Sequence, residues 1–292
     1  MPRFNPLTTI LRTAQSCIYT DRAFRLGAMA NRSHDSPVLF FTNGGFQGTP
    51  AQRAAAKELN DHGFLVFQIE HRLAPPNTAL GQTEHDNTPR GIASGRPPQQ
   101  TDDVKQQILA AMADRDWDQE NLFILGGSSG ASHALWVALD SSNQNVTEWT
   151  ETVRSKIKGV VGFSGLYDLH SRDYGDPGSN FDPETYLHVI QNYTNTTDNF
   201  VGLEFQFSVS PQTLVSAATN IPPIRLYATV NDTIPHNQSE NMRDALLNHG
   251  GVDVMEYTIE GNAHCFNQWY IENTNTYRCV REEVIAFLEA QL

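Results

Sequence analysis

Residues 122–130 read LFILGGSSG, an apolar run that ends in glycine and serine. The run at 122–125 predicts a buried strand, and the pattern at 131–139 predicts a helix directly after it. A G-x-S-x-G sequence between a strand and a helix is typical of a tight turn that lifts its central serine, Ser128, above the edge of a sheet. Small flanking residues let the strand and the helix pack closely around that turn. The segment therefore predicts an α/β fold and identifies Ser128 as a candidate nucleophile.

Apolar runs and helical patterns alternate on both sides of this segment. Strands are expected at residues 36–42, 63–69, 122–125, 160–163, 224–228 and 253–259. Helices are expected at residues 51–62, 103–113, 131–139, 237–248 and 280–292. Strands separated by helices form βαβ units, which predicts a mostly parallel central sheet with helices on both faces.

Two long segments interrupt the alternation. Residues 76–101 are rich in proline, glycine and asparagine, and residues 170–220 are irregular but rich in aromatic side chains. Long loops in compact domains are commonly lids or disordered segments. We therefore expect one domain over residues 1–292, with a loop insertion at 76–101 and an ordered lid or cap at 170–220.

A serine hydroxyl becomes nucleophilic when a histidine takes its proton and an acid orients that histidine. In this fold class the chain order is serine, acid, histidine, each on a loop after a strand. His264 follows the expected strand 253–259, and Asp232 follows the strand 224–228. The sequence thus predicts a Ser128, Asp232 and His264 triad.

Alternatives stay open at two triad positions. Ser129 also has small flanking residues and could be the nucleophile, and Asp168 also follows a strand and could be the acid. Surface or packing roles are expected for the histidines inside or beside later helices, and the histidines near the second strand lie upstream of the serine, in the wrong order. These are His62, His71, His133, His236 and His249.

An oxyanion intermediate needs backbone N–H donors near the nucleophile. The N–H of Ser129 would lie at the N-terminus of the helix after the turn, where the helix dipole favours negative charge. A second donor is expected from the loop after the first strand, where Asn43, Gly44, Gly45 and Phe46 follow one another. Glycine there allows a close approach of backbone to substrate.

The composition excludes several classes of partner. The 292 residues include 20 Lys+Arg and 33 Asp+Glu, a formal net charge of −13. Nucleic-acid binding needs clustered basic side chains, so it is not expected. No stretch approaches the roughly 18 apolar residues of a membrane span. The N-terminal residues lack the apolar core of a signal peptide, so a cytoplasmic protein is expected.

The sequence predicts no cofactor and no metal, because it contains neither a phosphate-binding loop nor a CxxC pair. Its three cysteines are Cys17, Cys265 and Cys279. This odd set is unlike a disulfide framework, although a bridge from Cys17 to Cys279 stays open. Nothing in the sequence indicates the oligomeric state.

The chain resembles the esterase branch of the α/β-hydrolases, which includes hormone-sensitive-lipase-like, feruloyl-esterase-like and kynurenine-formamidase-like proteins. The matching motifs lie between residues 38 and 266: N-G-G-F at 43–46, E-H-R-L-A-P at 70–75, G-G-S-S-G at 126–130, Ser210-Pro211, Asn231-Asp232 and G-N-A-H at 261–264. The resemblance implies an oxyanion hole made by the N–H groups of Gly45, Phe46 and Ser129. It also implies the triad already identified.

Three features depart from the family pattern. Asn43 stands where a histidine is usual, Gly127 stands where a larger residue commonly precedes the nucleophile, and the 76–101 segment is long. We expect a serine hydrolase of a small or medium-sized ester or amide, with an N-formyl amide as one variant. A non-hydrolytic use of the pocket also stays open, as a cyclase, lyase, acyltransferase or ligand-binding protein.

Overall fold

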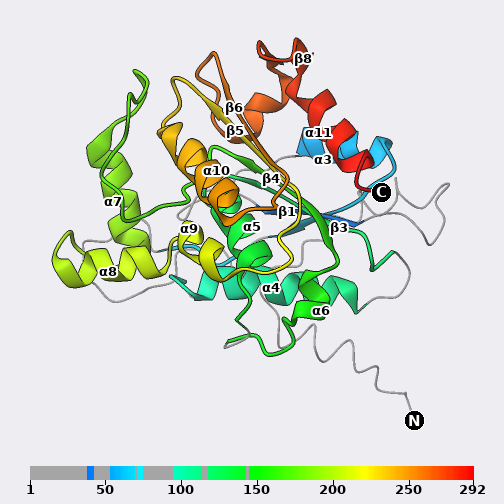
Figure 1. Ribbon diagram of the computed structural model, residues 1–292, viewed down its shortest axis with the longest axis horizontal. Coiled ribbons are helices and arrows are strands. Elements are labelled where there is room, and N and C mark those ends of the chain that lie inside the picture. The colour runs from blue at the N-terminus through cyan, green and yellow to red at the C-terminus, as the bar shows by residue number, and fades with distance from the viewer. Residues whose placement is uncertain (1–37, 43–52, 70, 75–94, 114–117, 143–144) are drawn as a thin grey trace.

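The computed structural model describes residues 38–42, 53–69, 71–74, 95–113, 118–142 and 145–292. Six parallel strands form one sheet in the order β2-β1-β3-β4-β5-β6 (Figure 1). They are β1 (Val38–Thr42), β2 (Leu65–Ile69), β3 (Leu122–Gly127), β4 (Ile157–Phe163), β5 (Ile224–Thr229) and β6 (Val254–Ile259). The predicted parallel sheet is confirmed.

Helices connect the strands and cover both faces of the sheet. The principal ones are α3 (Arg53–Asp61), α4 (Gln99–Met112), α5 (Ser129–Leu139), α10 (Asn237–His249) and α11 (Val280–Glu289). Shorter elements are α6 (Glu151–Arg154), α9 (Pro211–Leu214), η1 (Val215–Ala217), η2 (Cys265–Tyr270), β7 (Glu272–Asn273) and β8 (Arg278–Cys279). None of the described helices has both the length and the hydrophobicity needed to cross a membrane.

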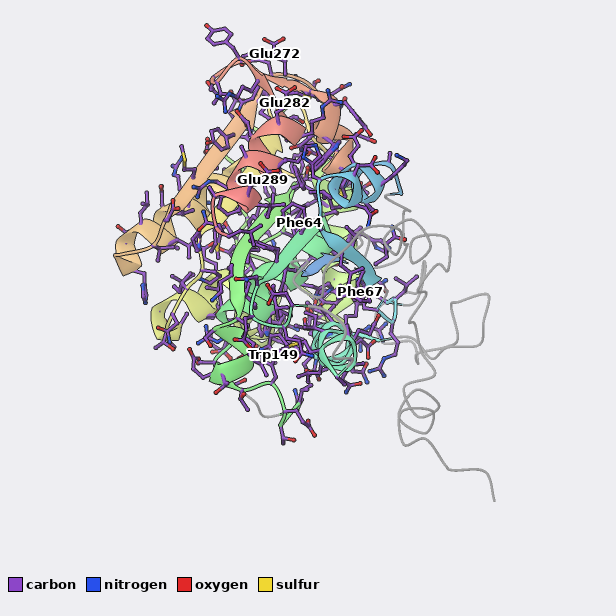
Figure 2. All side chains as sticks on the ribbon, turned by 90° about the vertical axis from the view of Figure 1, so that its right-hand side faces the viewer. Phe64, Phe67, Trp149, Glu272, Glu282 and Glu289 are labelled. Carbon is purple, nitrogen blue, oxygen red and sulfur yellow. The ribbon has the colours of Figure 1, made fainter. Side chains whose placement is uncertain are left out.

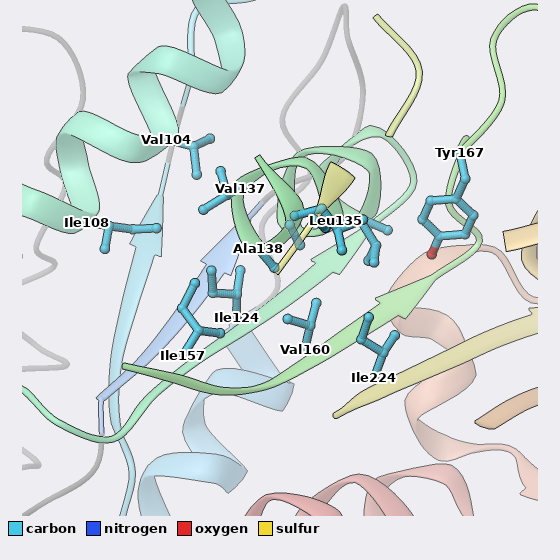
Figure 3. Packing of buried hydrophobic residues seen from close by; sticks show 14 of the residues in the cluster. Val104, Ile108, Ile124, Leu135, Val137, Ala138, Ile157, Val160, Tyr167 and Ile224 are labelled. Carbon is cyan, nitrogen blue, oxygen red and sulfur yellow. The ribbon is translucent and has the colours of Figure 1, made fainter. Parts of the chain in front are cut away.

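Alternating side chains of β3 divide the core into two layers. Ile124 packs with Val104 of α4 and Leu135 of α5 on one face (Figure 3). Phe123 and its neighbours pack on the other face against α3 and α11. This arrangement follows from the two-residue period of a strand that is buried on both faces.

The strand order contains one reversal of direction, at β1. The chain runs from β1 outward to β2 and then crosses to β3 on the other side of β1. Ligands of open parallel sheets bind beyond the carboxyl ends of the strands at such a reversal. The turn after β3, which carries Ser128, lies at this position.

The described parts of the long insertions differ in detail from the sequence expectation, and residues 75–94 of the first one lie outside the described residues. Helix α4 begins at Gln99, inside the expected 76–101 loop. Residues 170–220 were expected to be irregular, but they contain α7 (Pro183–Thr194) and α8 (Phe200–Ser208), which lie beside the sheet (Figure 1). Asp182 and Asn199 cap these helices with their side chains, and aromatic residues at the apolar positions obscured the helical period.

Candidate active site

The turn at Ser128 has the strained geometry that its sequence predicts. Ser128 lies between β3 and α5 with φ 55° and ψ −126°. A positive φ at a residue with a side chain costs on the order of 1–3 kcal/mol. A Cβ atom at Gly126 would lie 2.6 Å from the nitrogen of Ala131, so this position requires glycine. The backbone N–H of Ser128 donates to the carbonyl of Phe163 at 2.8 Å, which anchors the turn to β4.

Ser129 begins α5 and is fully buried. Its N–H belongs to the first turn of the helix, where backbone donors have no acceptor within the helix, so it can serve a developing oxyanion. Its hydroxyl is enclosed in the interior, which argues against Ser129 as the nucleophile. The other predicted oxyanion donors, Gly45 and Phe46, lie outside the described residues.

Asp232 and His264 are brought together from loops after neighbouring strands. The Nδ1 atom of His264 lies 2.7 Å from Oδ1 of Asp232, whose side chain is fully buried. Asp232 Oδ1 also accepts the backbone N–H of Thr233 at 2.6 Å. Because a carboxylate accepts at Nδ1, that nitrogen carries the proton, and Nε2 is left as the basic atom of the ring.

Opposing effects act on the pKa of His264. Burial of the ring disfavours the imidazolium, whereas the hydrogen bond to Asp232 and the adjacent sulfur of Cys265 favour it. The favourable effects prevail and raise the pKa of His264 from 6.5 to about 10. A base with a raised pKa is stronger once deprotonated, and activity that depends on it rises with pH.

The turn at Ser128 and the loop at His264 lie against each other. A Cβ atom at Gly127 would lie 3.0 Å from the ring of Phe266 and would overlap the sulfur of Cys265. The departure from the family pattern at Gly127 therefore has a steric cause, because the residues after His264 occupy that space. Within the described part of the chain, the hydroxyl of Ser128 makes no hydrogen bond to His264. Such bonds are often long before substrate binds.

The competing candidates have other contacts. Asp168 Oδ1 accepts the backbone N–H groups of His170 and Ser171, so this carboxylate stabilises a turn. The alternative histidines contact Glu289 (His62), the carbonyl of Arg72 (His71), Thr101 and Gln100 (His133), Glu240 (His236), and the carbonyls of Gly250 and Ala218 (His249). These contacts fit the packing and surface roles expected for them.

Ser164 and Gln268 were not identified from the sequence, yet both lie at Asp232. The hydroxyl of Ser164 donates to Asp232 Oδ2 at 2.5 Å, and Gln268 Nε2 lies 3.5 Å from the same oxygen. The one available signal for Ser164 was its place directly after a buried strand, at the same edge of the sheet as Ser128 and Asp232. Gln268 lies in η2, and its sequence context carries no comparable signal.

Ionisable side chains also gather away from the triad. Among the described residues, no cluster of three or more His, Cys, Asp or Glu is arranged to hold a metal. A hollow of about 550 Å³ lies between α3 and α11, and Glu282 and Glu289 of its lining are visible along α11 (Figure 2). Glu58 and Asp61 add further negative charge there. Within the described ranges neither Cys265 nor Cys279 forms a disulfide, and Cys17, with the bridge to Cys279 that the sequence leaves open, lies outside them.

Comparisons with known proteins agree with this fold. The family model described as BD-FAE matches residues 90–246, more than half of the chain. No curated protein sequence gives a significant match.

Several solved structures with a similar fold are named as esterases or other hydrolases. An acetyl ester-xyloside bifunctional hydrolase from Caldicellulosiruptor lactoaceticus superposes with a TM-score of 0.63 at 17% identity, covering 90% of this chain and 86% of that chain. The esterase Est2 from Thermogutta terrifontis gives 0.62 at 19% identity, with coverages of 90% and 84%. Esterase B from Lactobacillus Rhamnosis gives 0.60 at 14% identity, with coverages of 98% and 96%. The fold is that of the α/β-hydrolases.

Proposed function

The chain belongs to the BD-FAE family of α/β-hydrolases, and we propose that it is a serine hydrolase of a small or medium-sized carboxylic ester or amide. The observation that carries this proposal is the 2.7 Å contact between His264 Nδ1 and Asp232 Oδ1. This contact lies at the sheet edge where the strained Ser128 turn also lies. The hydrolase and esterase names of the structural relatives support the same class of reaction.

In the first half of the reaction, Nε2 of His264 takes the proton of the Ser128 hydroxyl as Oγ bonds to the substrate carbonyl carbon. Asp232 keeps the imidazole in the required tautomer and stabilises the imidazolium that forms. The N–H of Ser129 stabilises the oxyanion, together with the proposed donors Gly45 and Phe46. The carbonyl re-forms, the bond to the alcohol or amine breaks, and His264 returns the proton to that leaving group.

In the second half, water replaces the leaving group. His264 takes a proton from water, the water oxygen bonds to the acyl carbon, and the Ser128 ester bond breaks with return of the proton to Oγ. The products are a carboxylic acid and a free enzyme. No cofactor takes part in these steps.

The segment 170–220 is proposed to cap the substrate site of a single domain that extends over residues 1–292. Tyr186, Ile190 and Tyr193 of α7 pack in one apolar cluster with Leu166 and Leu169, which follow β4. The cluster docks α7 beside the carboxyl edge of the sheet. A cap in this position favours a substrate of moderate size.

The test is turnover of short p-nitrophenyl esters by the wild-type chain and by Ser128→Ala. We expect the variant to lose at least about 10³-fold in kcat, because the covalent route is closed. Ser129→Ala provides the matched control, since it deletes the neighbouring hydroxyl and keeps the backbone N–H. Wild-type activity in Ser128→Ala, or its loss in Ser129→Ala alone, would refute the assignment of the nucleophile.

Labelling by a fluorophosphonate probe distinguishes hydrolysis from a non-hydrolytic use of the pocket. We expect the wild-type chain to be labelled at Ser128 and Ser128→Ala to remain unlabelled. A parallel screen of acyl esters, aryl esters and N-formyl amides then identifies the substrate class. An unlabelled wild-type chain that turns over none of these substrates would contradict the proposed function.

A further inference from the structure

Ser164 lies directly after β4, and β4 separates the nucleophile strand β3 from the acid strand β5. It is 2% exposed and has a φ of 50°. Its backbone N–H donates to the carbonyl of Tyr227 at 2.8 Å. A serine held in the left-handed region persists only when its surroundings hold it there. The contacts of its hydroxyl show what holds it.

The Ser164 hydroxyl has its full set of hydrogen-bond partners. Oγ lies 3.0 Å from the backbone nitrogen of Cys265, 2.7 Å from Nε2 of Gln268, and 2.5 Å from Oδ2 of Asp232. A hydroxyl has one proton to donate and two lone pairs to accept with. The backbone N–H of Cys265 can only donate, so it occupies one lone pair.

The orientation of the Gln268 amide determines which atom occupies the second lone pair of Ser164 Oγ. Its Nε2 atom also lies 3.1 Å from the carbonyl oxygen of Ala263. Because that carbonyl can only accept, the atom facing it is the amide nitrogen. This nitrogen donates one proton to the carbonyl oxygen of Ala263 and one to Oγ of Ser164. Both lone pairs of Ser164 Oγ are then occupied, and its single proton is directed to the carboxylate of Asp232.

Asp232 consequently receives donors on each carboxylate oxygen. His264 and Thr233 donate to Oδ1, and Ser164 donates to Oδ2. Hydrogen bonds to both oxygens hold a buried carboxylate in one rotation. The Cys265 N–H follows His264 in the chain, so Ser164 joins the acid and the backbone of the histidine loop in one network.

We infer that Ser164 is a positioning residue that fixes the rotation of Asp232 and, through it, the ring of His264. The inference rests on the proposed function for its catalytic consequence. Gln268 and the Cys265 N–H set the direction of the Ser164 proton. Deleting the hydroxyl should lower kcat on the order of 10- to 100-fold, the range that a misplaced catalytic group causes. KM should change less than about threefold, because the Ser164 side chain is buried and its hydroxyl bonds only groups of the protein in the described residues.

Ser164→Ala and Ser164→Gly together separate the hydroxyl from the backbone. Both variants delete the hydroxyl, and the glycine also removes the conformational cost of a positive φ. We expect kcat to fall in both. Wild-type kcat in Ser164→Gly would overturn the inference, since the serine would then matter only as a strained residue.

A double-mutant cycle tests whether Ser164 acts through Asp232. In an Asp232→Ala background, Ser164→Gly should cost less than about twofold more in kcat, because the group that it orients is gone. If Ser164→Gly lowered kcat by the same factor in the Asp232→Ala background as in the wild type, the inference would be overturned. Ser210→Ala is the matched control, since this fully buried serine accepts the N–H of Leu169 and donates to the carbonyl of Gln206 away from the triad. It should lose stability and keep kcat.

A spectroscopic readout keeps this inference distinct from the proposed function. The Nδ1 proton of His264 between ring and carboxylate should give a low-field proton resonance, assigned by its loss in His264→Ala. Ser164→Gly should shift or broaden this resonance, and Ser210→Ala should not. If Ser164→Gly changes the resonance but Ser128→Ala retains turnover, the proposed function is refuted and the positioning role is not. An unchanged resonance in Ser164→Gly would refute the positioning role alone.

Discussion

Two regions are held together by different kinds of contact. One is the corner of the sheet around Asp232, with Ser164, His264 and Gln268, and the other is the proposed cap at residues 170–220. At the corner, buried hydrogen bonds join loops after three neighbouring strands, and the Asp232 side chain is fully buried. In the cap, the main ionic contact is the pair Arg172–Asp198, whose side chains are 28% and 34% exposed. Phe200 and Val201 of α8 are 74% and 71% exposed. Buried hydrogen bonds therefore hold the corner, whereas the cap includes a partly exposed ion pair and exposed apolar side chains.

The difference has a physical reason. A partly exposed ion pair is screened by water and contributes little, whereas a buried carboxylate loses its water and must have hydrogen bonds in replacement. Changes at the corner should therefore alter kcat and the pH profile. Changes in the cap should alter stability or KM with little effect on kcat.

The largest effect is expected from Asp232→Asn. The amide cannot stabilise the imidazolium, so kcat should fall by about 10⁴-fold. Burial, which lowers the pKa of His264, then acts without the carboxylate that raises it. In the wild type, activity should fall as the pH falls through the raised pKa of about 10, whereas in the variant this decline should move to lower pH.

Profiles of kcat/KM from pH 5 upward, recorded for both proteins, measure this shift. Asp168→Asn is the control, because that carboxylate accepts the local backbone N–H groups of His170 and Ser171 in its turn. If the profiles of the wild type and of Asp232→Asn had the same midpoint, the carboxylate of Asp232 would have no part in raising the pKa of His264.

A smaller effect is expected from Gly127→Ala. The added methyl group would press on Cys265 and Phe266 and displace the His264 loop. Overpacking of this kind costs about 1–3 kcal/mol, and a catalytic group displaced by about 1 Å can cost about 100-fold in rate. Denaturant unfolding and ester turnover measure the two losses.

Gly250→Ala is the control for Gly127→Ala. Gly250 has a φ of 87° and open space where a Cβ atom would lie, so its substitution strains the backbone away from the site. We expect a loss of stability without a loss of kcat. Retention of full activity in Gly127→Ala would show that the His264 loop tolerates displacement.

The smallest effect on kcat is expected from Arg172→Met in the cap. The guanidinium bonds Asp198 and Gln206, and methionine keeps most of the apolar stem. The unfolding free energy should fall by about 1 kcal/mol, and kcat for a small ester should change less than about threefold. A kcat loss as large as that of Gly127→Ala would show that the cap, too, positions the reacting groups.

Much of the architecture could be predicted from local patterns. The apolar run at 122–125 and the glycines after it identified the central strand and the turn at Ser128, because burial and close packing restrict residue types there. The order of Asp232 and His264 along the chain indicated their loops. The helices α7 and α8 were missed, since their aromatic residues resemble core material of an irregular segment.

The sequence by itself determined the parallel α/β sheet, the strained turn at Ser128 and the candidate acid and base, because strand periodicity and turn chemistry are local. Only the tertiary structure decided that Asp232, not Asp168, contacts His264. It also decided why residue 127 is glycine and which hydroxyl orients the acid. These relations join residues that follow separate strands, with 137 residues of chain between Gly127 and Cys265. Contacts of that kind depend on how neighbouring strands align at the sheet edge, which no local pattern encodes.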